Sequence, residues 1–409
     1  MSVEPSKEGA TPEPPEDAAA TGTLAARIAL KQRAGGIVVP VLTAFLAFLI
    51  GGIVVAATQH SVRKAVLAYR DIFNGAGLNW IFHPSTDVVQ TAPYNLSQTL
   101  LQTTTLILTG LAVAFAFRCG MFNIGGQGQY FVGMFLASWV GVSFAHMAGF
   151  PHVLLAIGAA TLGGALWAGI AGVLKATVGA HEVISTIMLN WIAIWIGTYL
   201  FGDGGPLQGA ANKPGHVPIS ADVADGAKLP VFWGDKDLQG LHVGFFVALA
   251  AVVVFWLILN RTTLGYEVRA VGFNPDAAAY GGISVRKNLI RAMAISGAFA
   301  GLAGGLDMLG YLYHFGVSDI PVSTVGFLGI AVALLGRNTA VGTLLGAFLF
   351  GSLLFGTTNG LQSGVIPTEL AGNLTSIIQG MVVLFVGADV LILYVWNTRR
   401  KLRKKAATA

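Results

Sequence analysis

The chain has 409 residues, and its content of 54% hydrophobic and 11% charged residues contrasts with roughly 25% charged residues in soluble domains. This composition excludes an ordinary soluble domain and predicts a polytopic membrane protein. The net charge of +5 does not indicate nucleic-acid binding, because the basic residues lie beside apolar spans. The single cysteine, Cys119, excludes an intrachain disulfide and a metal site made of cysteines alone.

Residues 1–34 are acidic and rich in proline and alanine, and they contain no apolar core of the signal-peptide type. We therefore predict that this segment is a disordered tail. Arg27, Lys31 and Arg33 precede the first apolar span, and further basic residues close the chain in the segment 399–409. Because basic residues collect on the cytoplasmic side of a membrane protein, both tails are predicted to be cytoplasmic.

Between the tails, residues 35–398 form a predicted all-α transmembrane domain. The apolar stretches lie near 35–58, 96–117, 125–146, 153–178, 181–201, 241–260, 291–311, 322–336, 340–358 and 374–396. Most of them are long enough to cross a bilayer, which takes about 20 residues, so the domain has about ten transmembrane helices. The eighth stretch is short and predicts a broken or partly re-entrant element.

The positive-inside rule supports this arrangement. Alternation from a cytoplasmic N-terminus places 18 of the 24 lysines and arginines on the cytoplasmic side. Spans two to five and spans seven to ten then enter the membrane from opposite sides, so a duplicated four-helix block would be an inverted repeat. The same alternation places two large connections, 59–95 and 202–240, on the outer side.

In the first outer connection, apolar residues recur at helical spacing from Val62 to Phe73 and predict an amphipathic helix along the outer surface. The second outer connection contains Gly204-Gly205-Pro206 and several acidic residues. Connections of this length are either functional or disordered. Two interpretations are open: a docking surface for an external partner, or a passive connector.

Residues 120–129, GMFNIGGQGQ, interrupt the apolar pattern with Asn123, Gln127, Gln129 and several glycines. Polar side chains at membrane depth are costly unless they face protein or water. Two interpretations are open here as well. Either the three amides line a substrate path, or they belong to a tight turn that packs two helices near the cytoplasmic boundary.

A partial metal motif follows at His181 and Glu182. Ser185 occupies the place of the second histidine of a zinc-hydrolase motif, and the remaining histidines are scattered, so we predict no metal site. Deeper in the same span, Asn190 either bonds a solute or forms a hydrogen bond between helices.

The polar segment 261–290 separates the sixth and seventh spans. Its centre contains a helix start, small residues and a helix stop, in the order Asn274, Pro275, Asp276, Ala277, Ala278, Ala279, Gly281 and Gly282. Asparagine caps a helix, proline fits its first position, aspartate suits the positive end of its dipole, and glycine ends it. The pattern predicts a short cytoplasmic helix, which is either a contact for a separate motor subunit or an ordinary solvated loop helix.

In the seventh span, Gly297, Gly301 and Gly305 recur at four-residue spacing and predict a stripe for close helix packing. Asp307 follows inside the apolar stretch, where an acid suggests a function, and we expect it to hold helices or to take part in gating. Phe327 lies in the short eighth stretch, where a broken helix would offer backbone groups to a ligand. The candidate substrate path is Asn123, Gln127, Gln129, Asn190, Asp307 and Phe327.

Five motifs taken together resemble a known family. They are FNIGGQGQ, HEVISTIMLNWIA, GYEVRAVGFNPDAAAYGGI, SGAFAGLAGGLDMLG and GFLGIAVALLGRN, in this order along roughly residues 96–390. They are similar to the inner-membrane permeases of bacterial ABC importers for nucleosides and simple sugars. Gln127 and Leu328 depart from this family, whose members commonly have Glu and often have Asp at these positions.

The resemblance implies a multi-pass protein of the bacterial inner membrane with several partners. A separate ABC ATPase would dock on the inner face, with the helix around Asn274–Tyr280 and the nearby Gly282 as the coupling element. A second, homologous permease chain would complete the pore as a heterodimer, and a lipid-anchored binding protein would deliver the cargo. The cargo implied is a nucleoside rather than a simple sugar.

Two other classes of protein were weighed. An ion-coupled secondary transporter of a small polar solute also uses inverted repeats and broken helices, and it is the main alternative. An enzyme is not indicated, because the chain has neither a phosphate-binding G-x-x-x-x-G-K-[ST] loop nor a nucleophile–base motif. No cofactor is implied.

Overall fold

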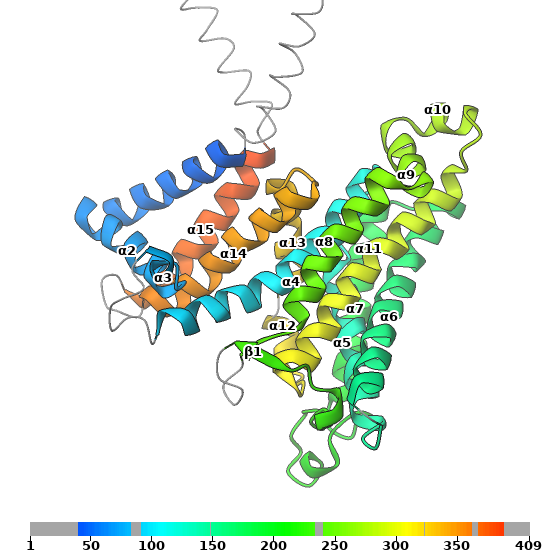
Figure 1. The fold of residues 1–409 in the computed structure, drawn as a ribbon, viewed down its shortest axis with the longest axis horizontal. Coiled ribbons are helices and arrows are strands. Elements are labelled where there is room, and N and C mark those ends of the chain that lie inside the picture. The colour runs from blue at the N-terminus through cyan, green and yellow to red at the C-terminus, as the bar shows by residue number, and fades with distance from the viewer. Residues whose placement is uncertain are drawn as a thin grey trace, which may run out of the picture.

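The computed structural model of the chain describes residues 40–82, 91–147, 149–233, 240–322, 324–361 and 367–387. The predicted tails at 1–34 and 399–409 lie outside these residues. In the described part the chain is a bundle of α-helices with one antiparallel pair of short strands (Figure 1). The prediction of an all-α membrane fold is confirmed in this part.

Seven helices in the described part are long and apolar enough to cross a membrane. They are Pro40–Thr58, α4 (Ala92–Arg118), α6 (Gly149–Val178), α7 (Glu182–Phe201), α8 (Gly244–Arg261), α11 (Val285–Asp307) with its continuation η4 (Met308–Leu312), and α14 (Ala340–Gly360). Three more helices coincide with the remaining predicted spans: α5 (Gly126–Ser143), α13 (Val325–Leu335) and α15 (Thr368–Gly387). That all ten cross the membrane stays a prediction, as does the inverted repeat.

Shorter elements connect these helices. They are α2 (Val62–Gly75), α3 (Asn79–Phe82), η2 (Ala210–Asn212), η3 (Asp225–Ala227), β1 (Val231–Trp233), β2 (Leu241–His242), α9 (Thr263–Phe273), α10 (Pro275–Tyr280) and α12 (Asp319–Val322). The short eighth span, predicted at 322–336, is occupied by α13, and the short helix α12 ends where that span begins. With 11 residues, α13 is about 16 Å long, roughly half of the hydrocarbon thickness.

Capping residues fix where several helices begin. Thr262, Asn274, Ser284 and Thr339 each accept a hydrogen bond from a free backbone N–H in the first turn of the helix that follows. Such caps satisfy donors that have no partner within the helix. The helix predicted from the Asn274 cap is confirmed as α10.

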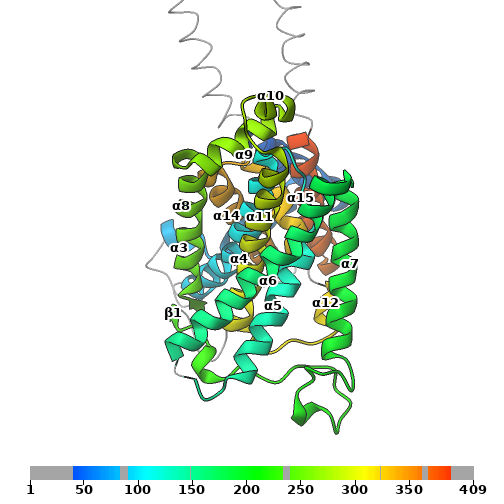
Figure 2. The ribbon, with the colours of Figure 1, turned by 90° about the vertical axis from the view of Figure 1, so that its right-hand side faces the viewer.

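The two ends of the described chain lie on one side of the bundle. The start of Pro40–Thr58 and the end of α15 are found at the end of the molecule that carries α9 and α10 (Figure 1). The segment 202–233 lies at the opposite end, as Figure 2 also shows. This arrangement agrees with the alternation of sides that the basic residues predict.

Helices α6 and α11 pack closely against each other. A Cβ added to Gly297 would lie 2.2 Å from the carbonyl oxygen of Gly164, and one added to Gly301 would lie 2.3 Å from that of Ala160. The two backbones are therefore in direct contact, which only residues without a side chain allow. The third glycine of the predicted stripe, Gly305, lies against the side chain of Ala160.

The amphipathic helix predicted from Val62 to Phe73 is confirmed as α2, whereas its place on the outer surface stays a prediction, and the face that it packs on protein was not predicted. Ala65, Ala68 and Ile72 are buried, whereas Val62 and Val66 are exposed. This face lies close against α14: a Cβ added to Gly356 of α14 would lie 2.5 Å from the carbonyl oxygen of Ile72. Hydrophobic spacing finds the larger apolar side chains and overlooks a face of small residues.

Candidate functional site

The turn between α4 and α5 is the centre of a buried polar network. The Asn123 amide donates to Gln129 Oε1 at 2.8 Å and to Ser296 Oγ at 2.7 Å, and it accepts from the Gly125 N–H and from Gln129 Nε2. Ser296 belongs to α11 and donates onward to the Ala112 carbonyl in α4. One asparagine therefore joins the turn to α5 and α11.

Two further amides cap helices that begin inside the protein. Asn190 of α7 accepts from the Gly128 N–H at 2.8 Å, and Gln127 of α5 accepts from the Gly326 N–H at 2.7 Å. Gly128 and Gly326 lie in the first turns of α5 and α13, where backbone donors have no partner within the helix. Both glycines are buried, so these donors need a partner from the protein, and a side chain supplies it.

The predicted path residues differ in exposure. Asn123, Gln127, Gln129, Asn190 and Asp307 are at most 3% exposed, whereas Phe327 is 45% exposed. The structure brings the four amides together around one turn and does not place them on a surface in this conformation. Phe327 lies on α13, the helix that Gln127 caps.

Asp307 lies apart from the amide network, at the end of α11. Its Oδ1 accepts a hydrogen bond from Thr105 of α4 at 2.6 Å, and its Oδ2 accepts one from Tyr130 of α5 at 2.7 Å. The carboxyl group therefore connects three helices, and both of its oxygens have partners.

The short helix α10 stands out at the end of the bundle (Figures 1 and 2). The Asn274 side chain accepts from the Ala277 N–H at 3.0 Å, and Gly282 leaves the helix with a φ of +81°. Ala278 faces inward and is buried, whereas Phe273 at the end of α9 and Tyr280 at the end of α10 are 92% and 98% exposed. Two aromatic side chains so exposed on neighbouring short helices indicate a contact surface.

A close contact connects α9, the helix before α10, to the polar turn between α4 and α5. A Cβ added to Gly272 of α9 would lie 2.3 Å from the Arg118 carbonyl oxygen, just before the turn that carries Asn123. Gly120, in the turn, lies against Gly272 and has a φ of +73°, which glycine adopts without strain. A displacement of α9 would therefore press directly on the turn.

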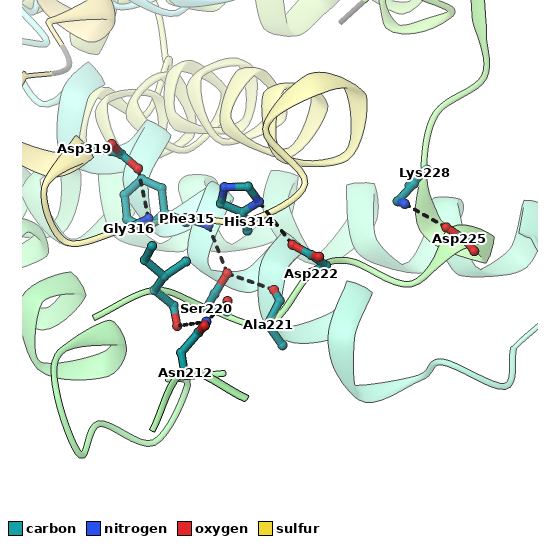
Figure 3. A network of polar contacts seen from close by, with 11 residues as sticks. Asn212, Ser220, Ala221, Asp222, Asp225, Lys228, His314, Phe315, Gly316 and Asp319 are labelled. Atoms are coloured by element: carbon teal, nitrogen blue, oxygen red, sulfur yellow. Dashed lines mark hydrogen bonds and ion pairs between the residues drawn. The ribbon is translucent and has the colours of Figure 1, made fainter. Parts of the chain in front are cut away.

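At the opposite end, the segment 202–233 is folded and fastened to the residues after η4 (Figure 3). The Ser220 N–H donates to the Phe315 carbonyl, and the Phe315 N–H donates to Ser220 Oγ, both at 2.9 Å. A contact between His314 Nδ1 and Asp222 Oδ1 at 3.1 Å lies beside these bonds. The segment 202–233 is thus an ordered surface attached to the chain that links α11 with α12 and α13.

A second contact between a histidine and an aspartate lies within the segment 202–233. His216 Nδ1 is 2.7 Å from Asp203 Oδ2, and this hydrogen bond holds the pKa of the Asp203 carboxyl below its ordinary value of 3.8. The Gln208 side chain accepts from the Gly204 N–H at 2.8 Å and so closes the same turn.

A model of one protein family matches residues 95–387, and its description is branched-chain amino acid transport system, permease component. The match covers more than half of the chain. The chain belongs to this permease family.

Three relatives align with the permease over most of its length. It is 41% identical to the guanosine ABC transporter permease protein NupP of Bacillus subtilis (strain 168), over 92% of this chain and 99% of that one. It is 30% identical to the nucleoside ABC transporter permease protein NupB of Lactococcus lactis, over 91% and 96% of the two chains. A glucose ABC transporter permease protein of Haloferax volcanii is 33% identical over 85% and 86%. No solved structure matches.

These relatives are transport permeases of the ABC class, and the chain is a multi-pass membrane permease of the same class. The resemblance drawn from five motifs is therefore confirmed. Nothing in the comparisons favours the ion-coupled alternative.

Several residues of the permease were missed by sequence reasoning. Thr105, Tyr130 and Ser296 complete the buried contacts of Asp307 and Asn123, and Gly272 forms the contact below α10. One signal was present: the run TLLQTTTLILTG in α4 places several threonines in an apolar span. Helix threonines can bond their own backbone, so the run alone did not single out Thr105.

Proposed function

We propose that the permease imports a nucleoside as one subunit of an ABC importer. The observation that carries this proposal is the 41% identity to a guanosine permease over nearly the whole of both chains. The glucose permease is less similar and is matched over a smaller share. The proposal includes no catalytic chemistry on the cargo.

A second, homologous permease completes the transporter in this proposal. Bacillus subtilis has a second guanosine permease protein, NupQ, which is 28% identical to this chain over 269 residues. Lactococcus lactis likewise has NupC beside NupB. Two different permeases for one cargo in each organism support a heterodimer.

A separate ATPase docks on the cytoplasmic end of α9 and α10. Phe273 and Tyr280 offer an exposed aromatic surface, and Asp276, Ala277 and Ala279 are exposed between them. The buried Ala278 supports α10 from within and does not itself contact the ATPase. Closure of the ATPase on ATP displaces α9, and the contact of Gly272 with Arg118 passes the displacement to the polar turn.

The polar network sets the positions of the helices around the path. Asn123, Asn190 and Gln127 connect the turn to α11, α7 and α13. A movement of the turn would therefore shift α13 and the half-exposed Phe327, which we propose contacts the cargo. Import requires that the cargo affinity differ between the inward and outward states.

The ordered segment 202–233 is the docking surface for a lipid-anchored binding protein on the outer side. Its attachment through Ser220 and Phe315 supports this proposal over a passive connector. Because the same attachment reaches the chain between η4 and α12, docking and path opening are connected.

The test is transport by the complete importer. The permease, its ATPase, the second permease and the binding protein are reconstituted in proteoliposomes, and uptake of radiolabelled guanosine is measured with and without ATP. We expect ATP-dependent uptake that unlabelled nucleosides inhibit and glucose does not. Dissipation of ion gradients at constant ATP should leave the rate unchanged.

Two results would overturn the proposal. Glucose as the better competitor would assign a sugar cargo. Uptake that follows an ion gradient and not ATP would assign a secondary transporter.

A further inference from the structure

Two arginines share a cavity at the α10 end of the bundle. Arg118 at the end of α4 and Arg269 of α9 line a space of about 270 Å³. The last turns of α8 and the turn before α14 form its other walls, and no acidic residue is among the described residues that line it. Among the described residues, neither arginine forms an ion pair with an acidic side chain.

Both guanidinium groups are held by neutral backbone carbonyls. Arg118 Nε–H donates to the Asn338 carbonyl at 2.8 Å, and Arg269 donates to the Leu259 carbonyl. Two positive charges are therefore fixed toward one space, where they repel each other. An anion with several acceptor oxygens would relieve this repulsion, and the fork of an arginine matches a phosphate group.

An apolar groove adjoins the charged cavity. It has a volume of about 420 Å³ and shares Thr339 and Val341 with the cavity. Its walls come from Pro40–Thr58, the end of α13 and the first turns of α14. Val341 and Leu345 on these walls are largely exposed, as expected of side chains that face lipid.

The charged cavity on one side of α14 and the apolar groove on the other side together fit an amphiphilic ligand. Free inorganic phosphate would use the arginines but not the groove. A neutral lipid would use the groove and leave the two like charges without a partner. The membrane itself supplies molecules with both features, namely anionic phospholipids.

We propose that these two cavities bind one anionic phospholipid of the inner leaflet. Its phosphate lies between Arg118 and Arg269, and an acyl chain passes Val341 into the groove. Because Arg269 belongs to α9 and Arg118 to α4, the lipid braces the segment below α10 against the bundle. The inference rests on the proposed orientation of the membrane domain and not on the cargo or the ATPase.

The experiment uses the full chain in phosphatidylcholine nanodiscs that contain phosphatidylglycerol with a photoreactive acyl chain. After irradiation, mass spectrometry measures labelling of peptides from α14 and Pro40–Thr58. We expect labelling there, and we expect Arg269→Gln to reduce it roughly fivefold, the factor for one basic residue at a membrane surface. Excess inorganic phosphate should not compete.

Arg286→Gln is the matched control. Arg286 Nε–H also donates to a backbone carbonyl, that of Ala176 at 3.0 Å, but Arg286 does not line either cavity. The control loses the same charge from the same end of the molecule and should keep its labelling. If Arg269→Gln does not yield monodisperse protein, Val341→Trp, which fills the shared wall, should lower labelling instead.

Three results would overturn the inference. They are equal labelling by a photoreactive phosphatidylcholine, equal loss in Arg269→Gln and Arg286→Gln, and displacement of the label by inorganic phosphate. Labelling as expected together with failed nucleoside uptake would contradict the proposed cargo alone.

Discussion

The Tyr130 hydroxyl of α5 donates a hydrogen bond of 2.7 Å to Oδ2 of Asp307, at the end of α11. Thr105 of α4 donates to the other oxygen. Asp307 is 1% exposed, so water does not compete for these bonds. The carboxyl group thus fixes the distances among three helices, and we infer that it holds the path rather than touching the cargo.

Removal of one of these donors should destabilise the bundle. In Thr105→Val the Oδ1 atom loses its partner, and an unsatisfied buried polar group costs about 1–3 kcal/mol. Thermal unfolding of the purified permease in detergent measures the loss. Thr104→Val is the control, because the Thr104 hydroxyl bonds the Leu100 carbonyl in its own helix. Equal midpoints for the two variants would contradict the role of Asp307 as a tie.

The contact of α6 with α11 predicts a second pair of variants. Gly301→Ala would bring a Cβ within 2.3 Å of the Ala160 carbonyl oxygen, and such overpacking typically costs about 1–3 kcal/mol. In Gly169→Ala on α6, the new Cβ would meet nothing within 4 Å. Gly301→Ala should lower the unfolding midpoint, whereas Gly169→Ala should leave it unchanged or raise it. If both variants behave alike, the backbones are not in contact.

Much of the fold follows from local sequence. Apolar length located the helices, and the order Asn274, Pro275, Asp276 predicted α10 because each residue suits one position at a helix start. The glycine stripe of α11 and the acid at Asp307 were found for similar reasons, since spacing and burial costs are properties of a single helix.

Partners between helices could not be predicted in the same way. Nothing local to Asn190 indicates that it caps α5, because the cap depends on how α7 packs beside it. The carbonyl that meets Gly272 belongs to Arg118, more than a hundred residues earlier. Helical periodicity gives the face of a helix and not its neighbour, so the sequence offered candidate site residues but not their contacts.

The exposed ends of α10 predict how the ATPase binds. Tyr280→Ala should weaken binding of the purified ATPase to the permease by about 2 kcal/mol, roughly thirtyfold, as expected for an aromatic anchor. Surface plasmon resonance on permease nanodiscs measures the affinity. Tyr266→Ala removes another exposed tyrosine, on α9, and serves as the control. An unchanged affinity for Tyr280→Ala would show that the ATPase docks elsewhere.

The same segment predicts a variant that separates docking from transport. A Cβ in Gly272→Ala would meet the Arg118 carbonyl oxygen at 2.3 Å, so the contact between α9 and the polar turn must change. We expect normal ATPase binding with strongly reduced nucleoside uptake. Gly281→Ala, whose nearest contact would be 3.5 Å away, should retain uptake. Reduced ATPase binding in Gly272→Ala would mean that the change acts on the docking surface itself.

The pair of Asp203 and His216 predicts a response of the segment 202–233 to acid. The hydrogen bond from His216 lowers the pKa of Asp203, so the folded turn favours the ionised carboxylate. Stability from this group is therefore present above its ordinary pKa of 3.8 and is lost as the pH falls through the lower folded value. The hydrogen-exchange protection factor near Gly204, that is, the rate of the unprotected amide at the same pH divided by the observed rate, should fall in that acidic range and stay flat above it. Asp203→Asn should lack the step, and a step that persists would have another cause.

Gln127 connects the polar turn to the half-span α13 through the Gly326 N–H, at 2.7 Å. Gln127→Leu removes the acceptor and leaves a buried donor unpaired, which costs about 1–3 kcal/mol. Because the bond holds the first turn of α13, which also carries Phe327, nucleoside uptake should fall together with the unfolding midpoint. Gln127→Glu keeps an oxygen at the same position, so both quantities should lie between those of the leucine variant and the wild type. A leucine variant as stable and as active as the wild type would mean that α13 is positioned without this bond, and Phe327 would then lose its proposed connection to the turn.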